Sequence, residues 1–255
     1  MSPEVTIRAL TGIKLVEPGD DLGMIAIGAL RANRLAPQDN DVLVVAQKIV
    51  SKAEGRYVDV ANVEPSERAT ALAAEVDKDP RFVEIVLSEA RRVVRHRPGL
   101  LIVEHRLGFV MANAGIDHSN IEPGAAGERV LLLPLDPDGS AARLRRWIED
   151  AFGAHVAVIV SDSFGRPWRK GTVGVALGAS GLPSFIDMRG HPDLFGRQLL
   201  VTETGFADEI AAAAGLVMGQ ADEAVPMVLV RGLAWSAPER PVADMVRAPE
   251  NDLFR

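Results

Sequence analysis

A carboxylate between two hydroxyl groups follows a short apolar run in the middle of the chain. Residues 156–160 are apolar and mostly β-branched, which predicts a buried strand, and they lead into Ser161-Asp162-Ser163. Oxygen ligands gathered at a strand end are how proteins hold hard divalent cations. The alternative is that Asp162 caps a local turn. The density of glycine and charge behind the strand favours a functional loop.

Three cationic side chains come next, on a segment with glycine and proline that predicts a loop. They are Arg166, Arg169 and Lys170. Guanidinium and ammonium groups bind phosphate and carboxylate, so this loop suits an anionic, phosphate-bearing substrate. A solvated surface is the simpler alternative. We expect these three residues to bind substrate close to Asp162.

A second oxygen-rich loop lies earlier in the chain. Asp117 and Asn120 are three residues apart and Gly115 gives the backbone freedom, so this loop could share a cation with Asp162. Such residues also fill turns for purely local hydrogen-bonding reasons. His118 offers a transition-metal ligand, but no second histidine lies at ligand spacing, and we disfavour such a site.

Two lysines follow another predicted buried strand, residues 42–46. Lys48 and Lys52 are four residues apart. They are either phosphate ligands at a strand-to-helix junction, where ligand sites tend to gather, or a solvated edge. The spacing alone leaves both open.

The composition restricts the classes of protein and site. The chain has 255 residues, no cysteine and a net charge of −7, so disulfides, thiolate metal sites and cysteine nucleophiles are excluded. The negative charge argues against nucleic-acid binding by the whole surface. No apolar run approaches the roughly 20 residues that cross a bilayer, and the N-terminus lacks a signal-peptide pattern, so we expect a cytoplasmic protein that does not bind membranes.

Hydrophobic periodicity, caps and turn residues predict the elements that position these groups. We expect one domain over residues 1–255, with an irregular tail from residue 235. Predicted strands cover residues 5–10, 42–46, 100–104, 108–112, 129–135, 156–160, 199–202 and 225–230. Predicted helices cover residues 20–34, 80–97, 138–152 and 206–215, with loops at 178–181 and 190–196. The helix at 80–97 carries basic residues at its C-terminal end, and Trp147 is expected to point inward.

The common nucleotide and hydrolase fingerprints are absent from the sequence. It has no G-x-x-x-x-G-K-[ST] loop, no G-x-G-x-x-G after a strand and no G-x-S-x-G elbow. The residues by themselves therefore indicate a metal-dependent enzyme acting on phosphate-bearing small molecules.

Six segments in order resemble the coenzyme F-420:L-glutamate ligase family. They read GIKLVEPGDDL, DVLVVAQKIVSKAEGR, ANAGIDHSN, VIVSDSFGRPWRKG, VTETGFADEIA and MGQADEAVPMVLVRG. The resemblance implies a GTP-dependent amide ligase that adds L-glutamate to the carboxylate of a phospholactyl deazaflavin, coenzyme F-420-0, and extends a γ-linked tail. It implies an α+β fold specific to the family, with mixed sheets, flanking helices and two intimately packed lobes, in a homodimer. It also implies Mg²⁺ or Mn²⁺, two per site, and K⁺.

The resemblance also assigns site residues. Asp117 and Asp162 match the ligands of the first cation, and Ser163 and Gln220 match those of the second. The positions that match GTP contacts are Ile13, Lys14, Leu15, Val16, Gln47, Lys52, Asn120, Met218, Gly219, Gln220, Ala221, Asp222, Glu223, Ala224 and Val225, with Lys48 as a neighbouring phosphate partner. Two of them depart from the family pattern: Lys14 replaces a common proline, and Gln47 stands where relatives can carry serine.

The implied chemistry suits these residue types. Transfer of the γ-phosphate to the acceptor carboxylate makes an acyl phosphate, which the glutamate amine then attacks. No general base can be identified in the sequence. Two alternatives stay open: a ligase of the same fold that joins another acid and amino acid, and a non-catalytic module that binds nucleotide or deazaflavin.

Overall fold

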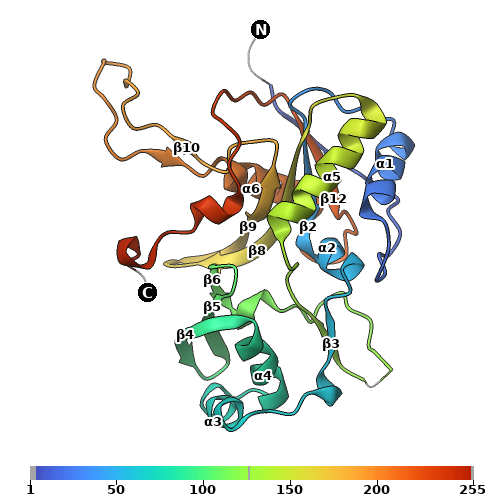
Figure 1. The fold of residues 1–255 in the computed structure, drawn as a ribbon, viewed down its shortest axis with the longest axis vertical. Coiled ribbons are helices and arrows are strands. Elements are labelled where there is room, and N and C mark those ends of the chain that lie inside the picture. Colours follow the sequence, from blue (N-terminus) through green and yellow to red (C-terminus); the bar gives the residue numbers. More distant parts are fainter. Residues whose placement is uncertain (1–3, 126, 254–255) are drawn as a thin grey trace.

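A five-stranded mixed sheet forms the centre of the computed structural model, which describes residues 4–125 and 127–253 (Figure 1). Its strand order is β1 (Thr6–Ala9), β12 (Met227–Arg231), β2 (Val42–Ala46), β8 (Ala157–Arg166) and β9 (Arg169–Ser180). β2 and β8 run parallel, and the other neighbouring pairs are antiparallel. The parallel pair brings the carboxyl end of β2 beside the middle of β8, with Ala46 opposite Ser161.

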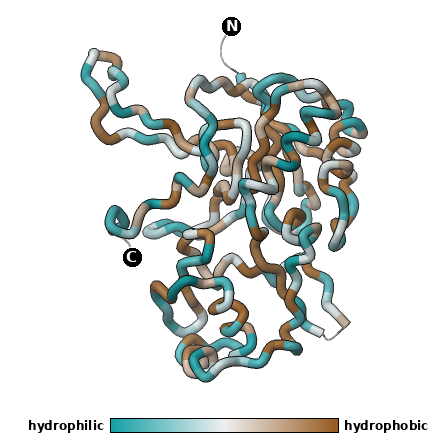
Figure 2. Tube along the Cα trace, viewed as in Figure 1, coloured by the Kyte–Doolittle hydropathy of each residue, from teal (hydrophilic) through white to brown (hydrophobic). Residues whose placement is uncertain are grey.

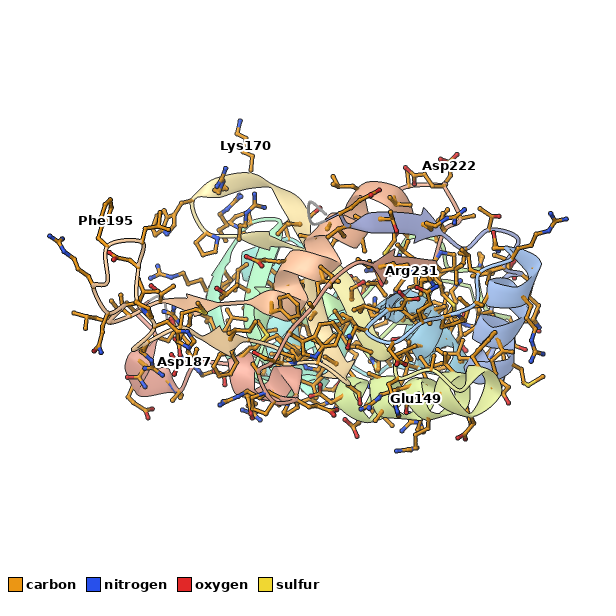
Figure 3. All side chains as sticks on the ribbon, turned by 90° about the horizontal axis from the view of Figure 1, so that it is seen from above. Glu149, Lys170, Asp187, Phe195, Asp222 and Arg231 are labelled. Carbon is orange, nitrogen blue, oxygen red and sulfur yellow. The ribbon has the colours of Figure 1, made fainter. Side chains whose placement is uncertain are left out.

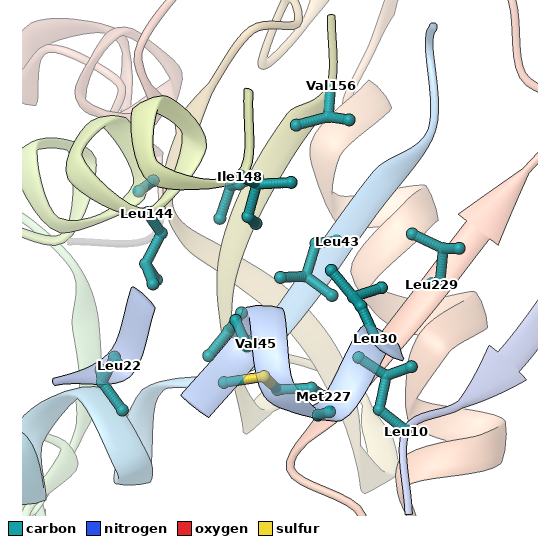
Figure 4. Packing of buried hydrophobic residues seen from close by; sticks show 14 of the residues in the cluster. Leu10, Leu22, Leu30, Leu43, Val45, Leu144, Ile148, Val156, Met227 and Leu229 are labelled. Carbon is teal, nitrogen blue, oxygen red and sulfur yellow. The ribbon is translucent and has the colours of Figure 1, made fainter. Parts of the chain in front are cut away.

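Helices cover both faces of this sheet. α1 (Leu22–Ala32), α2 (Gln47–Ala53) and α5 (Pro137–Phe152) pack on one face, and α6 (Phe206–Met218) packs on the other. Alternate strand residues divide between the two cores: Leu43 and Val45 face α1 and α5, whereas Val42 and Val44 face α6. Figure 4 shows the first core, and Figure 2 shows the apolar strands at the centre of the molecule. Burial on both faces explains why β2 and β8 are continuous apolar runs.

A third core, separate from the two on the faces of the central sheet, is built by residues between α2 and α5 at the lower end of Figure 1. Its elements are β3 (Tyr57–Asp59), α3 (Glu67–Val76), α4 (Pro80–Ser88), β4 (Ala90–Arg97), β5 (Leu100–His105), β6 (Val110–Ala112) and β7 (Arg129–Leu131), with 3₁₀ turns at Val60–Asn62 and Asn113–Gly115. β3 pairs with β7, and the other three strands form a sheet in the order β4-β5-β6. An extended arm carries β10 (Ile186–Asp187) and β11 (Glu203–Thr204), and the tail has 3₁₀ turns at Val242–Met245 and Pro249–Asn251.

Most of the predicted elements are confirmed. Side-chain caps start the helices: Asp21 accepts from the backbone of Met24 in α1, and Asp136 accepts from Gly139 in α5. The strands β1, β2, β5, β6 and β12, the helix α6 and an irregular tail also agree with the sequence patterns. Within residues 4–125 and 127–253, no helix has the length and apolar character that crossing a bilayer requires.

The predicted helix at residues 80–97 is wrong in its second half. α4 ends at Ser88, and the next residues form β4, which pairs antiparallel with β5 and places Val93 opposite Val103. A short apolar pattern with valines suits either element, and the partner strand decides. The basic residues of this segment therefore cannot complement a helix dipole, and Arg92 instead donates to Glu104 at 2.8 Å.

The expected loop after residue 160 is also wrong. β8 continues to Arg166, turns and returns as β9, so Asp162 lies within a strand, opposite Val175, and residues 178–180 are strand rather than loop. Long-range pairing overrides the local signals of glycine and proline here. Three smaller expectations also fail: β7 ends at Leu131, residues 199–202 are not a strand, and Trp147 is 42% exposed, lying against Gly23 of α1.

A buried ion cluster joins the β5–β6 turn to the chain that leaves α2. Glu89 Oε2 accepts from Arg56 Nη2 and Arg106 Nε, both at 3.0 Å, and lies 3.3 Å from His105 Nε2. His105 is fully buried, and its Nδ1 accepts from the backbone of Leu107, so Nε2 carries the proton and donates to Glu89. Burial alone would raise the pKa of Glu89, but the hydrogen bonds from His105 and Arg106 and the charge of Arg56 lower it to about 2.

We expect Glu89→Gln to lower the free energy of unfolding at pH 7 by about 3 kcal/mol, because it leaves partly buried cations without a counter-charge. The folded pKa of about 2 lies below the ordinary value of 4.5, so this stabilisation is complete above pH 5 or so and is lost as the pH falls from about 4.5 towards 2. Urea unfolding at pH 7 and pH 3 measures the effect, and the difference in free energy of unfolding between the unchanged protein and Glu89→Gln should be smaller at pH 3.

Glu75→Gln is the control, because the Glu75 carboxylate is 61% exposed beside His96, and its replacement should cost under about 1 kcal/mol. Equal losses in both variants would contradict the prediction.

Candidate active site

A cavity of about 410 Å³ opens beside the central sheet, where β2 ends next to the middle of β8. Its walls are the start of α2, the middle of β8, the end of α6 and the turn that follows it, with residues 13–16 closing one side. The size lies in the range of small-molecule sites. Every residue assigned to GTP by the resemblance lines this cavity, together with Asp162 and Ser163.

The parallel pairing of β2 with β8 explains why these residues meet. Ala46 lies opposite Ser161, so α2, which begins at Gln47, starts beside Asp162, while β8 itself continues to Arg166. Ligand sites in such sheets gather at the carboxyl ends of parallel strands. Lys48 and Lys52 of α2 therefore reach the cavity, which favours the functional interpretation of the lysine pair.

Asp117 lies beside the cavity and is bonded to two of its residues. Its Oδ2 accepts from Gln47 Nε2 at 2.6 Å, and its Oδ1 is 3.4 Å from Lys48 Nζ. The residue sits between η2 (Asn113–Gly115) and β7, and its backbone pairs with Leu131 in both directions. The contact between Gln47 and Asp117, which are 70 positions apart in the chain, thus joins the third core to the cavity.

Burial raises the pKa of both carboxylates at the site. Burial raises the pKa of Asp117, opposed by Lys48 and Gln47. Burial also raises the pKa of Asp162 to about 7, and the negative charge of Asp117 adds to the effect. Two crowded carboxylates with raised pKa values are what a site for a hard divalent cation presents before the cation neutralises them.

The donor set consists of oxygens. Ser163 Oγ donates to Gln220 Oε1 at 2.7 Å, so the two residues matched to the second cation lie in contact. Among the described residues, no group of three or more histidine, aspartate or glutamate side chains could hold a metal ion. The residues present therefore fit a magnesium-type cation that also takes water and phosphate oxygens, and do not fit an all-protein cage.

Loop residues after Asp117 bind the two lysines. Lys48 Nζ donates to the carbonyl and the hydroxyl of Ser119 at 3.2 and 3.1 Å, and Lys52 Nζ donates to the carbonyl of Asn120 at 2.8 Å. Asn120 Nδ2 reaches across to the carbonyl of Ala221 at 3.1 Å. Burial and the neighbouring charge of Lys48 lower the pKa of Lys52. The loop therefore spans the cavity between α2 and the turn after α6.

The cations of the β8–β9 hairpin do not line the cavity. Arg166, Arg169 and Lys170 are exposed near the hairpin tip, and none forms an ion pair with a residue in 4–125 or 127–253. Lys170 and Asp222 project from the same side of the molecule, opposite Glu149 (Figure 3). Lys170 thus lies on the same side of the molecule as Asp222 of the cavity lining, and the role of the hairpin cations in substrate binding stays a prediction.

Several cavity residues were not predicted. They are Ala46, Ile49, Ser161, Gly174, Ala211, Gly215 and Pro226. Most are small or apolar and carry no chemical signal in the sequence, since they shape the walls. Ser161 is the exception, because it precedes Asp162 in the segment that predicted the cation site.

Known proteins resemble this chain over most of its length. Residues 12–232 match the family model described as F420-0:Gamma-glutamyl ligase. The chain is 44% identical over 253 residues to the coenzyme F420:L-glutamate ligase of Methanothermobacter thermautotrophicus, covering 98% of this chain and 99% of that protein. Proteins of the same name from Methanopyrus kandleri and Archaeoglobus fulgidus are 45% and 43% identical, covering 99% and 98% of this chain and 98% and 96% of theirs.

Proposed function

The chain belongs to the F420-0:gamma-glutamyl ligase family, which confirms the resemblance of the six segments, and on that premise we propose that it joins L-glutamate to coenzyme F-420-0. The acceptor is the carboxylate of the phospholactyl deazaflavin, and further glutamates extend a γ-linked tail. GTP supplies the energy and leaves as GDP and phosphate. The observation that carries the proposal is the pair of carboxylates, Asp117 and Asp162, at a cavity with two lysines.

The reaction proceeds in two steps. An acceptor carboxylate oxygen attacks the γ-phosphorus of GTP, the bond from that phosphorus to the bridging oxygen breaks, and GDP leaves. The amine of glutamate then attacks the acyl carbon, phosphate leaves with its oxygen, and the amine loses a proton. A carboxylate oxygen is a poor leaving group, whereas phosphate leaves readily. Phosphorylation of the acceptor therefore allows the amide bond to form.

The residues divide this work. Lys48 and Lys52 bind the nucleotide phosphates. Their ammonium groups then exchange the carbonyls of Ser119 and Asn120 for phosphate oxygens, which releases this loop from the two lysines. Asp117 and Asp162 would hold one divalent cation, and Ser163 and Gln220 a second. When bound, Mg²⁺ or Mn²⁺ neutralises negative charge on the phosphate groups. K⁺ assists.

The quaternary state and location follow the same family premise. We propose a homodimer of chains that each pack as two lobes within one domain, in the cytoplasm, without nucleic-acid or membrane partners. Static light scattering tests whether the protein is a dimer. The substrates of the proposed reaction are GTP, L-glutamate and the phospholactyl deazaflavin.

Mass spectrometry tests the reaction. The glutamate-free deazaflavin is incubated with protein, GTP, Mn²⁺ and L-glutamate, and each glutamyl addition appears as a discrete mass step that also reports tail length. Omission of GTP, and replacement by ATP, tests the nucleotide. If no addition occurs although GTP is hydrolysed with another acid and amine, the protein is a ligase of the same fold for other substrates. If GTP or deazaflavin binds and nothing turns over under any pairing, the protein is a binding module.

Neutralising the hairpin cations should weaken binding of the deazaflavin. We expect Arg169→Gln with Lys170→Gln to raise KM for the phosphate-bearing acceptor about tenfold, which corresponds to losing roughly 1–2 kcal/mol of charge-assisted contact, with KM for GTP unchanged. Steady-state kinetics with each substrate varied in turn measures both constants. Arg31→Gln, which changes a cation on α1 packed over Phe152, is the control. An equal rise of both KM values would show that the hairpin cations do not act specifically on the acceptor.

A further inference from the structure

Two buried polar side chains on α2 form a chain that ends on Asp117. Ser51 Oγ donates to Gln47 Oε1 at 2.9 Å, and Gln47 Nε2 donates to Asp117 Oδ2 at 2.6 Å. Gln47 is 2% exposed and Ser51 is fully buried. They lie one turn apart on one face of the helix, as residues four positions apart do.

The chemistry of the three groups sets the direction of the chain. An ionised carboxylate only accepts hydrogen bonds, so the amide nitrogen of Gln47 must face Asp117. The amide oxygen then points to Ser51, whose hydroxyl is its donor. A reversed amide would bring two acceptors to within 2.6 Å. Asp117 sets which end of the Gln47 amide it meets, and Ser51 holds that amide from the other end by donating to its oxygen.

Ser51 has no other visible task at the site. It does not line the cavity, whereas Gln47 does. Among the described residues, the Ser51 hydroxyl bonds with Gln47 alone. A buried hydroxyl directed at another buried side chain, instead of the helix carbonyl that serine usually finds, indicates that the amide orientation matters.

We propose that Ser51 and Gln47 are positioning residues that orient Asp117 for a hard divalent cation. The inference rests on the cation site of the proposed function and adds two residues to it that act through Asp117. Groups that hydrogen-bond to a metal-ligating carboxylate hold its oxygens in place, and their loss weakens metal binding.

The test measures Mn²⁺ binding in the absence of nucleotide and substrate, from the electron paramagnetic resonance signal of free Mn²⁺. We expect Gln47→Leu to weaken Mn²⁺ binding about 10- to 100-fold and Ser51→Ala about tenfold. The double variant should bind Mn²⁺ as weakly as Gln47→Leu alone, because Ser51 acts only through Gln47.

Ser184→Ala is the matched control. Ser184 is also fully buried, and its hydroxyl donates to the carbonyl of Pro241 at 2.7 Å, far from the cavity lining. Both serine variants should melt earlier, and only Ser51→Ala should lose Mn²⁺ affinity. Unchanged Mn²⁺ binding in Ser51→Ala, or an equal further loss when Ser51→Ala is added to Gln47→Leu, would overturn the proposal.

The outcome is separable from that of the ligase assay. Absence of Mn²⁺ binding in the unchanged protein would overturn the positioning role even if glutamate addition occurs with another cation. Conversely, the expected Mn²⁺ series without any glutamate addition would support the role of Ser51 and Gln47 and overturn the named reaction.

Discussion

We expect Asp162→Asn to slow the proposed glutamate addition about 10³-fold or more and to make the cation-free protein more stable at pH 8. The loss of activity follows because a cation that neutralises the phosphate groups contributes several kcal/mol to catalysis, and each 1.4 kcal/mol or so is a factor of ten. The gain in stability follows because the variant removes a charge that burial and Asp117 both penalise.

The sign of the pH dependence can be worked out for the cation-free protein. The pKa of Asp162 is about 7 in the folded state and near its ordinary value of 3.8 when unfolded. Between these values the folded state holds a proton that the unfolded state has lost, so the free energy of unfolding falls as the pH rises from about 4 to 7. The full penalty, roughly 2–4 kcal/mol, is present above pH 8 or so and absent below about pH 4.

Thermal unfolding at pH 4.5 and pH 8, with EDTA and then with Mn²⁺, measures these effects. The variant should melt above the unchanged protein only at pH 8 with EDTA, and Mn²⁺ should raise the midpoint of the unchanged protein alone. Asp150→Asn, an exposed acid on α5, is the control and should alter neither activity nor midpoint. An Asp162→Asn protein that retains most activity would show that this carboxylate is not part of the cation site.

Gly178→Ala should be strongly destabilising, because the added methyl group meets backbone atoms. The new Cβ would lie 2.2 Å from the carbonyl carbon of Pro137 and 2.5 Å from the nitrogen of Asp138, which are backbone atoms at the start of α5. Backbone cannot rotate away as a side chain can, so α5 or β9 must move. We expect the free energy of unfolding to fall by about 3 kcal/mol or more and the melting midpoint by roughly 6–12 °C.

The loss should be large because the contact is tied down on both sides. Asp138 Oδ1 accepts from the backbone of Ala179 at 2.7 Å and of Val242 at 2.9 Å, so separating α5 from β9 breaks these bonds as well. Gly28→Ala in α1 is the matched control, because its Cβ would meet nothing within 4 Å. It should stabilise the protein by about 0.5–1 kcal/mol through helix propensity. Losses of the same sign in both variants would contradict the close-approach argument.

Local patterns in the sequence determined most of the helices and the buried strands. Asp21 before an apolar helical period and the unbroken run at residues 156–160 predict α1 and the start of β8 correctly, because caps and periodicity act over a few residues. The carboxylates Asp117 and Asp162 and the lysines Lys48 and Lys52 were also visible, since their residue types are unusual beside buried strands. The order of six segments identified the family, and the GTP positions that the resemblance assigns stay a prediction.

The tertiary structure decided where a local pattern suits more than one element. Residues 90–97 form β4 instead of the end of a helix because β5 pairs with them, and β8 continues through Asp162 to Arg166 because β9 pairs with it. Pairing between segments depends on which surface each can bury, and this is a property of the whole chain. Only the folded chain brings Gln47 to Asp117, 70 residues away, and so only the tertiary structure reveals the Ser51–Gln47–Asp117 chain at the candidate active site.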